Sequence, residues 1–204
     1  KLKYYQMEGY IFPDTYEFYI IPALEDNKEL DTSDYAADAL DIIYQNFNNK
    51  ITARYYNRMT ELGLTLDETI TLASIAQREA DTTANMGNVA SVFFNRMADE
   101  ESFPHLESDV TVHYVDEHIK PHLTNNQFDQ KMFDAYNTYK CVGIPVGPIC
   151  NPGLDAIKAV LYAPETNYYY FCADPETTDM YFAETIAEHE ENLRKCGLDH
   201  AIAD

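Results

Sequence analysis

"TLASIAQREAD", residues 71–81, sets the central question of this sequence. At helical spacing Leu72, Ile75 and Ala76 share one apolar stripe, and the next turn of the stripe reaches Glu79. Burial disfavours the charged form of a carboxylate and raises its pKa, so such a group can hold a proton near neutral pH and act as a general acid. Two interpretations stand side by side: Glu79 is a catalytic acid, or it turns sideways to solvent or pairs with a lysine or arginine.

The residues before this stretch define the register of its helix. Thr65 and Glu68 have the spacing of a capping box, so the helix is expected to begin directly after Thr65. This register supports the placement of Glu79 on the apolar side. Gln77 and Arg78 are then expected on the solvent-facing sides.

Composition limits the classes of protein to which the chain can belong. It has 204 residues, of which 46% are hydrophobic and 24% charged, as in ordinary globular domains with one sizeable core. The 35 acidic and 14 basic side chains give a formal net charge of -21, which would repel nucleic acid and anionic membrane surfaces. No apolar run approaches the roughly 18 residues of a membrane-spanning helix. Because the chain begins at Lys1 rather than at methionine, we expect that an anchoring or targeting segment has been removed from it.

The four cysteines lack the spacing of a metal site and are expected to be buried thiols or to pair with one another. They are Cys141, Cys150, Cys172 and Cys196.

Helical and strand-like patterns alternate along the chain and predict one α+β domain over residues 1–204. Helices are expected over residues 36–47 after the cap residues "DTSD", in a short segment that Gly63 ends, and over residues 85–97. One side of the last of these helices carries Val89, Val92, Phe93 and Arg96.

The remaining segments are predicted from turn and cap residues. "EGYIFPDTYEFYI", residues 8–20, is expected to form two short strands or one broken strand, and residues 99–126 a loop with short elements. "YYYFCAD" and "MYFA" are expected to pair as a hairpin.

Cap residues predict the two last helices. Asn151 is expected to cap a helix that begins at Pro152 and ends before Pro164, and Thr185 with Glu188 to cap the final one.

"HLESDVTVHY" supplies the second set of candidate site residues, namely Glu107, Ser108, Asp109 and Thr111. If Asp109 faced Glu79 across a cleft, the two could form the carboxylate pair of a hydrolytic glycosidase. The alternative is a solvated turn. The histidines nearby lack the His-Glu-x-x-His spacing of a zinc hydrolase, so no metal is predicted.

A third set, Tyr136, Asn137, Thr138 and Tyr139, lies beside a Gly/Pro-rich turn. Aromatic rings can pack on the apolar faces of pyranoses, while amide and hydroxyl groups bind sugar hydroxyls or acetamido groups. The alternative is that these aromatic residues belong to the core.

Several separated motifs resemble the catalytic domain of the MltG family (YceG-like proteins), membrane-anchored endolytic murein transglycosylases. The motifs come in the family's order over nearly the whole chain: "EGYIFPDTYEF", "LASIAQREA", "VFFNRM", "LESDVTVHY", "YNTYKCVGIPVGPICNPGLDAIKA", "YYYFCAD" and "EHEENL". The resemblance implies a lysozyme-like, lytic-transglycosylase-like catalytic domain of helices with short β-hairpins.

By this resemblance Glu79 matches the family's catalytic glutamate. Gln77 replaces an acid of the family pattern, and if Gln77 held the catalytic position the chain would be an inactive form. The apolar stripe argues for Glu79. Glu107 and Val110 replace a glutamine and a proline, whereas Asp109 and Thr111 are retained. The substrate-binding set implied is Glu107, Ser108, Asp109, Thr111, Tyr136, Asn137, Thr138, Tyr139 and Asn151.

The reaction implied is cleavage of the β-1,4 bond between N-acetylmuramic acid and N-acetylglucosamine without water, leaving 1,6-anhydro ends and requiring no cofactor. The implied parent protein has an amino-terminal membrane anchor and a small LysM-like region, and works outside the cytoplasmic membrane. Its implied partners are nascent peptidoglycan strands and the peptidoglycan synthases (penicillin-binding proteins). Two alternatives stay open, a muramidase that uses Glu79 with Asp109 and a glycan-binding module without turnover.

Overall fold

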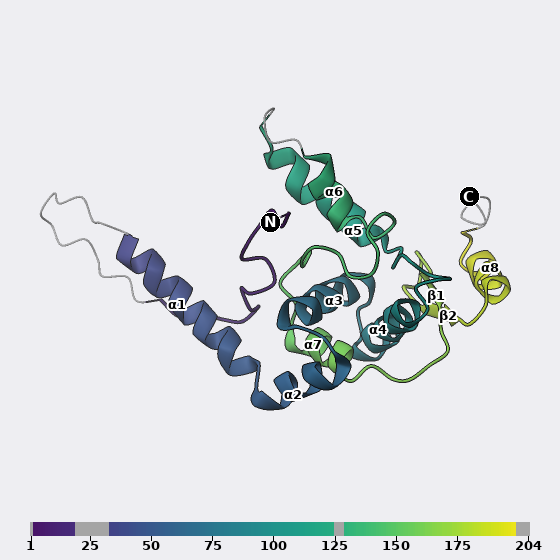
Figure 1. Cartoon of the computed structure of the whole chain (residues 1–204), viewed down its shortest axis with the longest axis horizontal. Coiled ribbons are helices and arrows are strands. Elements are labelled where there is room, and N and C mark those ends of the chain that lie inside the picture. Colours follow the sequence, from purple (N-terminus) through teal and green to yellow (C-terminus); the bar gives the residue numbers. More distant parts are fainter. Residues whose placement is uncertain (1, 19–32, 125–128, 199–204) are drawn as a thin grey trace, which may run out of the picture.

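The computed structural model describes residues 2–18, 33–124 and 129–198. Helix α3 (Leu66–Glu79) lies at the centre, and α2 (Ala53–Leu62), α4 (Thr83–Ala98) and α7 (Leu154–Leu161) pack around it (Figure 1). The predicted helix over residues 85–97 is confirmed as the larger part of α4.

Helix α3 is buried on all its sides over its middle turns. Each residue from Thr69 to Ala76 is at most 1% exposed, so the helix is a core element rather than an amphipathic one. The hydroxyl of Ser74 donates to the carbonyl of Thr71 and accepts from the backbone N–H of Ile149, which satisfies its polar atoms inside the core.

The start of α3 is the predicted capping box. The Thr65 hydroxyl accepts from the backbone N–H of Glu68, and the Glu68 carboxylate accepts from the N–H of Thr65 at 2.8 Å. Gly63, in the left-handed conformation, ends α2 as predicted. The central register is therefore a consequence of local cap chemistry.

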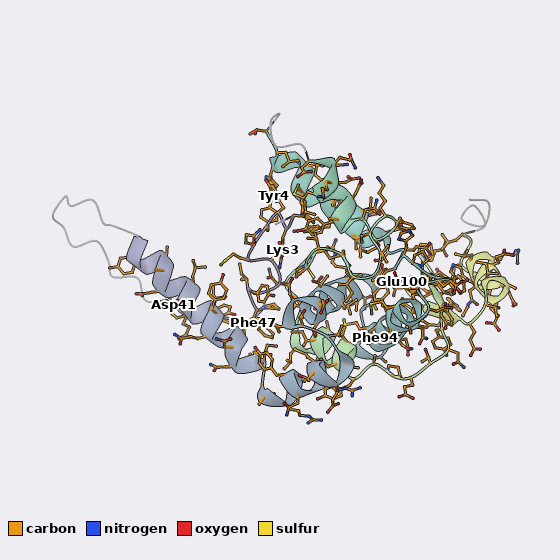
Figure 2. All side chains as sticks on the ribbon, viewed as in Figure 1. Lys3, Tyr4, Asp41, Phe47, Phe94 and Glu100 are labelled. Atoms are coloured by element: carbon orange, nitrogen blue, oxygen red, sulfur yellow. The ribbon has the colours of Figure 1, made fainter. Side chains whose placement is uncertain are left out.

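Helix α1 (Ser33–Lys50) extends away from this core (Figure 1). Figure 2 shows Asp41 on the middle of α1, farther from the body of the molecule than Phe47. The Phe47 ring is buried and lies 5.2 Å from the ring of Tyr10, so this end of the helix is the anchored one. The predicted helix is confirmed, whereas the first two of its predicted cap residues, 31 and 32, lie outside the described residues.

The predicted strands in the amino-terminal segment are wrong for the part that is described, residues 8–18, which forms a turn, bends and irregular backbone. The side-chain oxygen of Asn151 accepts from the N–H groups of Gly9 and Ile11, so this backbone is satisfied by an amide rather than by a partner strand. Asn151 is consequently not a helix cap, and α7 begins after Gly153 instead.

The predicted loop over residues 99–126 is mainly helical in its second half. Helix α5 (Asp109–Tyr114) continues into a π-helical turn (Val115–Ile119) and a 3₁₀ turn (Lys120–His122). Pro121 is tolerated because it stands at the start of a turn, where no N–H donor is needed. Helix α6 (Gln130–Tyr136) follows.

The predicted hairpin is confirmed as strands β1 (Tyr170–Ala173) and β2 (Met180–Ala183), paired antiparallel with Tyr170 opposite Ala183. The last helix, α8 (Ile186–Lys195), packs on the hairpin and begins with the predicted Thr185 capping box. The fold is thus α+β, as predicted. Among the described helices, none combines the length and the hydropathy that crossing a bilayer requires.

Gly9 is the position at which the amino-terminal turn depends most on the absence of a side chain. Its φ is +91°, and an added Cβ would lie 2.5 Å from Cγ of Pro148 and 2.7 Å from Cγ2 of Ile70. We expect Gly9→Ala to lower the free energy of unfolding by about 3 kcal/mol, measured by denaturant titration. Gly63→Ala is the matched control, because φ is also positive there but the space is open. We expect it to cost about 1 kcal/mol, and an equal cost for both would contradict this account.

Candidate functional site

Glu79 is the last residue of α3 and is half-buried where the helix leaves the core. Its Oε1 accepts a 2.5 Å hydrogen bond from the hydroxyl of Ser108. Burial raises the pKa of Glu79 and the negative charge of Asp109 raises it further, while the Ser108 hydrogen bond and the charge of His113 lower it. The net effect is a raised pKa, as the apolar stripe predicted.

Ser108 is held by a buried polar cluster with Thr111 and Thr138. The N–H of Ser108 donates to the Thr138 hydroxyl at 2.9 Å, and the Ser108 carbonyl accepts from the Thr111 hydroxyl at 2.8 Å. The two threonine hydroxyls lie 3.0 Å apart. All three residues are at most 1% exposed. The two threonines therefore hold the backbone of Ser108 so that its hydroxyl meets Glu79, and their own hydroxyls do not face a ligand.

Arg96, on α4, binds the turn at residues 105–107 that precedes Ser108. The sequence pattern did not predict this role. Its guanidinium donates to the Glu107 carboxylate at 2.8 Å, to the Leu106 carbonyl at 3.1 Å and to the Tyr169 carbonyl at 2.8 Å. Arg96 is 6% exposed, whereas the carboxylate that it binds is near the surface. An arginine on an otherwise apolar helix face was the available signal, because a buried guanidinium needs several acceptors.

Glu107 has a φ of +53°, a conformation that is costly for a residue with a side chain. Its backbone N–H donates to the carbonyl of Thr138, and its carboxylate is bound by Arg96. These two contacts hold the turn that delivers Ser108 to Glu79.

Asp109 and Tyr139 lie on the exposed side of the site. The Tyr139 hydroxyl donates to the Asp109 carboxylate at 2.6 Å, and the tyrosine is 45% exposed. Burial of its hydroxyl end and the bond to Asp109 raise the pKa of Tyr139, and the charge of Glu79 acts in the same direction. The side-chain oxygen of Asn137 accepts from the N–H of Tyr139 and shapes this turn. An exposed phenol and a carboxylate thus lie beside the half-buried acid.

Two predicted substrate-binding residues lie elsewhere. Tyr136 is 0% exposed, its hydroxyl accepts from the N–H of Tyr4, and its ring packs on Tyr114, so it is a core residue. Asn151 binds the amino-terminal turn and donates to the carboxylate of Glu8 at 3.3 Å. Burial raises the pKa of Glu8 as well, but its partners are Asn151 and Tyr114 rather than the Ser108 cluster.

The prediction that Gln77 faces solvent is wrong, because its side chain is partly buried against the start of α7. Its side-chain oxygen accepts from the N–H of Gly153 at 2.7 Å, which joins the end of α3 to the start of α7. Arg78 is exposed as expected. The last three residues of α3 thus make different contacts. Gln77 binds the start of α7, Arg78 faces solvent and Glu79 accepts the hydrogen bond from Ser108.

In the described parts of the chain, no three His, Cys, Asp or Glu side chains converge in a way that could bind a metal ion. Of the histidines near the site, His105 forms a hydrogen bond through its Nδ1 with the carbonyl oxygen of Cys141, at 2.9 Å.

The fold and the site define an α+β domain with a half-buried acid at the end of its central helix. The model of the YceG-like family matches residues 1–195, and the chain belongs to this family. It is 31% identical over 189 residues to the endolytic murein transglycosylase of Bacillus subtilis, covering 93% of this chain and 48% of that protein. Its identity to the endolytic murein transglycosylase of Streptococcus pneumoniae is 28% over 192 residues, with 93% and 32% covered.

A solved structure agrees with these similarities. The crystal structure of a YceG-like protein from Listeria monocytogenes matches with a TM-score of 0.70 and 31% identity, over 91% of this chain and 55% of that one. The chain therefore spans about a third to a half of the length of the curated relatives that it matches.

Arg96 provides a test of how the site is supported. We expect Arg96→Gln to lower the free energy of unfolding by about 3 kcal/mol, because several buried carbonyls lose their donor. Arg194→Gln is the matched control, since Arg194 makes an exposed ion pair with Glu190 one helical turn away. It is expected to change the free energy by less than about 0.5 kcal/mol. Similar denaturation midpoints for both variants would show that Arg96 does not stabilise the turn.

Proposed function

We propose that this chain is the catalytic part of a lytic murein transglycosylase that cleaves the β-1,4 bond between N-acetylmuramic acid and N-acetylglucosamine in glycan strands. The observation that carries the proposal is the half-buried Glu79, with a raised pKa and with one carboxyl oxygen bound by Ser108. The names of the relatives support the substrate class.

Glu79 would act first as an acid and then as a base. Protonated Glu79 gives its proton to the glycosidic oxygen as the bond from that oxygen to C1 breaks. The resulting carboxylate then takes the proton of the muramyl C6 hydroxyl while the C6 oxygen attacks C1. A 1,6-anhydro ring forms, no water is consumed, and Glu79 is protonated again for the next cycle.

The hydrogen bond from Ser108 supports this use of Glu79. Because Ser108 occupies Oε1, the second oxygen of the carboxyl group is the one available to carry the proton. The alternative assignment of catalysis to Gln77 is disfavoured, since the Gln77 amide is engaged by the backbone of Gly153.

The engagement of Asp109 favours a mechanism with one carboxylate. Its carboxylate accepts from the Tyr139 hydroxyl, which withdraws electron density from a would-be nucleophile. Asp109 would instead contribute charge near Glu79, and Tyr139 with Asn137 would orient the glycan. Ser108, Thr111 and Thr138 would position Glu79, and Glu107 would hold the turn through Arg96.

For the parent protein we propose a location at the outer face of the cytoplasmic membrane, held there by an amino-terminal anchor. There it would cut nascent strands beside the peptidoglycan synthases.

The ends of the products test the reaction. We expect mass spectrometry of uncrosslinked glycan strands to show new anhydro-muramyl ends with the parent chain, and at least about 100-fold fewer with Glu79→Gln. Glu100→Gln, on an exposed glutamate, is the control and should match the parent. New reducing ends would identify a muramidase. Strand binding without any new ends, in the parent as in Glu79→Gln, would identify a glycan-binding module.

Removing either of two charged neighbours of Glu79 is expected to shift the pH dependence of activity, in opposite directions for the two. Activity should fall as pH rises through the pKa of Glu79, because the proton donor is lost. Asp109→Asn removes a negative charge that raises this pKa, so the falling limb moves to lower pH. His113→Asn removes a positive charge that lowers it, so the limb moves to higher pH. Initial rates measured across pH decide this, and shifts in the same direction would contradict the assignment of the limb to Glu79.

A further inference from the structure

The carboxyl-terminal hairpin and α8 enclose a small core of their own. Its buried members are Cys172 on β1, Leu193 on α8 and Cys196 directly after α8, with Tyr181 and Leu198 packed against them. The Sγ atoms of Cys172 and Cys196 lie 4.0 Å apart, in van der Waals contact, and both residues are less than 9% exposed. Two thiols thus form most of the core that holds α8 on the hairpin.

The other two cysteines have different surroundings. The Cys150 thiol donates to the carbonyl of Ser74 at the central helix, and Cys141 is half-buried near His105. The spatial arrangement therefore distinguishes one pair from the four cysteines, which their spacing in the sequence could not do.

We propose that Cys172 and Cys196 are a cross-linking site that an oxidising disulfide converts into an intramolecular disulfide between β1 and the end of α8. The two sulfur atoms already touch, so rotation of the side chains has only about 2 Å left to close. The bond would join residues that are 24 positions apart and would tie the last helix to the hairpin.

The oxidant is a disulfide such as oxidised glutathione or the disulfide of a thiol oxidoreductase. One cysteine thiolate attacks a sulfur of the oxidant and releases one thiol, and the second cysteine thiolate then displaces the other. The cysteines lose two protons and two electrons, and the oxidant is reduced to two thiols.

The closed arrangement makes this exchange slow. Burial, and then the neighbouring Cys196, raise the pKa of Cys172 to about 12, so little thiolate exists at neutral pH. Local opening of α8 exposes both thiols, and the small size of the core that holds the helix makes such opening accessible. Oxidation is therefore expected to be faster at alkaline pH.

Tryptic peptides distinguish the proposed bond from every other pairing. Cleavage after Lys158, Arg194 and Lys195 places Cys172 in residues 159–194 and Cys196 in the peptide that follows Lys195. Cys141 and Cys150 stay together in residues 141–158, between Lys140 and the next cleavage site. The chain is incubated with oxidised glutathione, free thiols are blocked, and the digest is analysed without reductant.

We expect peptide 159–194 joined to the peptide that begins at Cys196, and peptide 141–158 with both thiols blocked. Blocked thiols on both Cys172 and Cys196 after oxidation at alkaline pH would overturn the proposal. So would a bond from Cys172 to residues 141–158.

Thermal unfolding of the oxidised and the reduced parent chain gives a second readout, and two variants serve as its controls. The oxidised chain should unfold about 5 °C above the reduced chain, because the cross-link restricts the unfolded state. Cys196→Ala should abolish this difference, and the matched variant Cys150→Ala should keep it. An equal midpoint for the oxidised and reduced parent chain would contradict the proposal, even where Cys196→Ala fails to fold.

Discussion

The burial of α3 on every side is the constraint on which the rest of the structure depends. Because its middle turns have no exposed face, α2, α4, α5 and α7 must all pack against one helix. The last turn then emerges from the core, and Glu79 lies at the point where the apolar surroundings end. The raised pKa of this carboxylate is thus a consequence of packing, with the adjacent charges as smaller corrections.

The same core also brings distant segments to Glu79. Ser108 reaches the carboxylate because Thr111 and Thr138 fix its backbone and because Arg96 binds the preceding residue. Arg96 in turn donates to Tyr169, directly before the hairpin. The carboxyl-terminal unit therefore contributes indirectly to the site, through a guanidinium whose acceptors come from two segments, residues 105–107 and Tyr169.

Much of the fold follows from local signals in the sequence. Thr65 with Glu68 and Thr185 with Glu188 are capping boxes that neighbouring atoms complete, so each helix start is predictable. The amino-terminal segment was mispredicted because alternating aromatic and β-branched residues favour a strand only where a partner strand exists. Asn151, more than 130 residues away in sequence, binds that backbone instead.

The candidate site was predictable in part for similar reasons. The stripe ending at Glu79 was visible in the sequence, whereas the bond of Gln77 to Gly153 and the burial of Tyr136 depend on tertiary packing. The most direct test of the central claim is an NMR titration of the Glu79 carboxyl carbon in the folded chain. We predict a pKa above the ordinary value for a glutamate side chain, about 4.3. A pKa at or below that ordinary value would contradict the claim that the core makes Glu79 a proton donor.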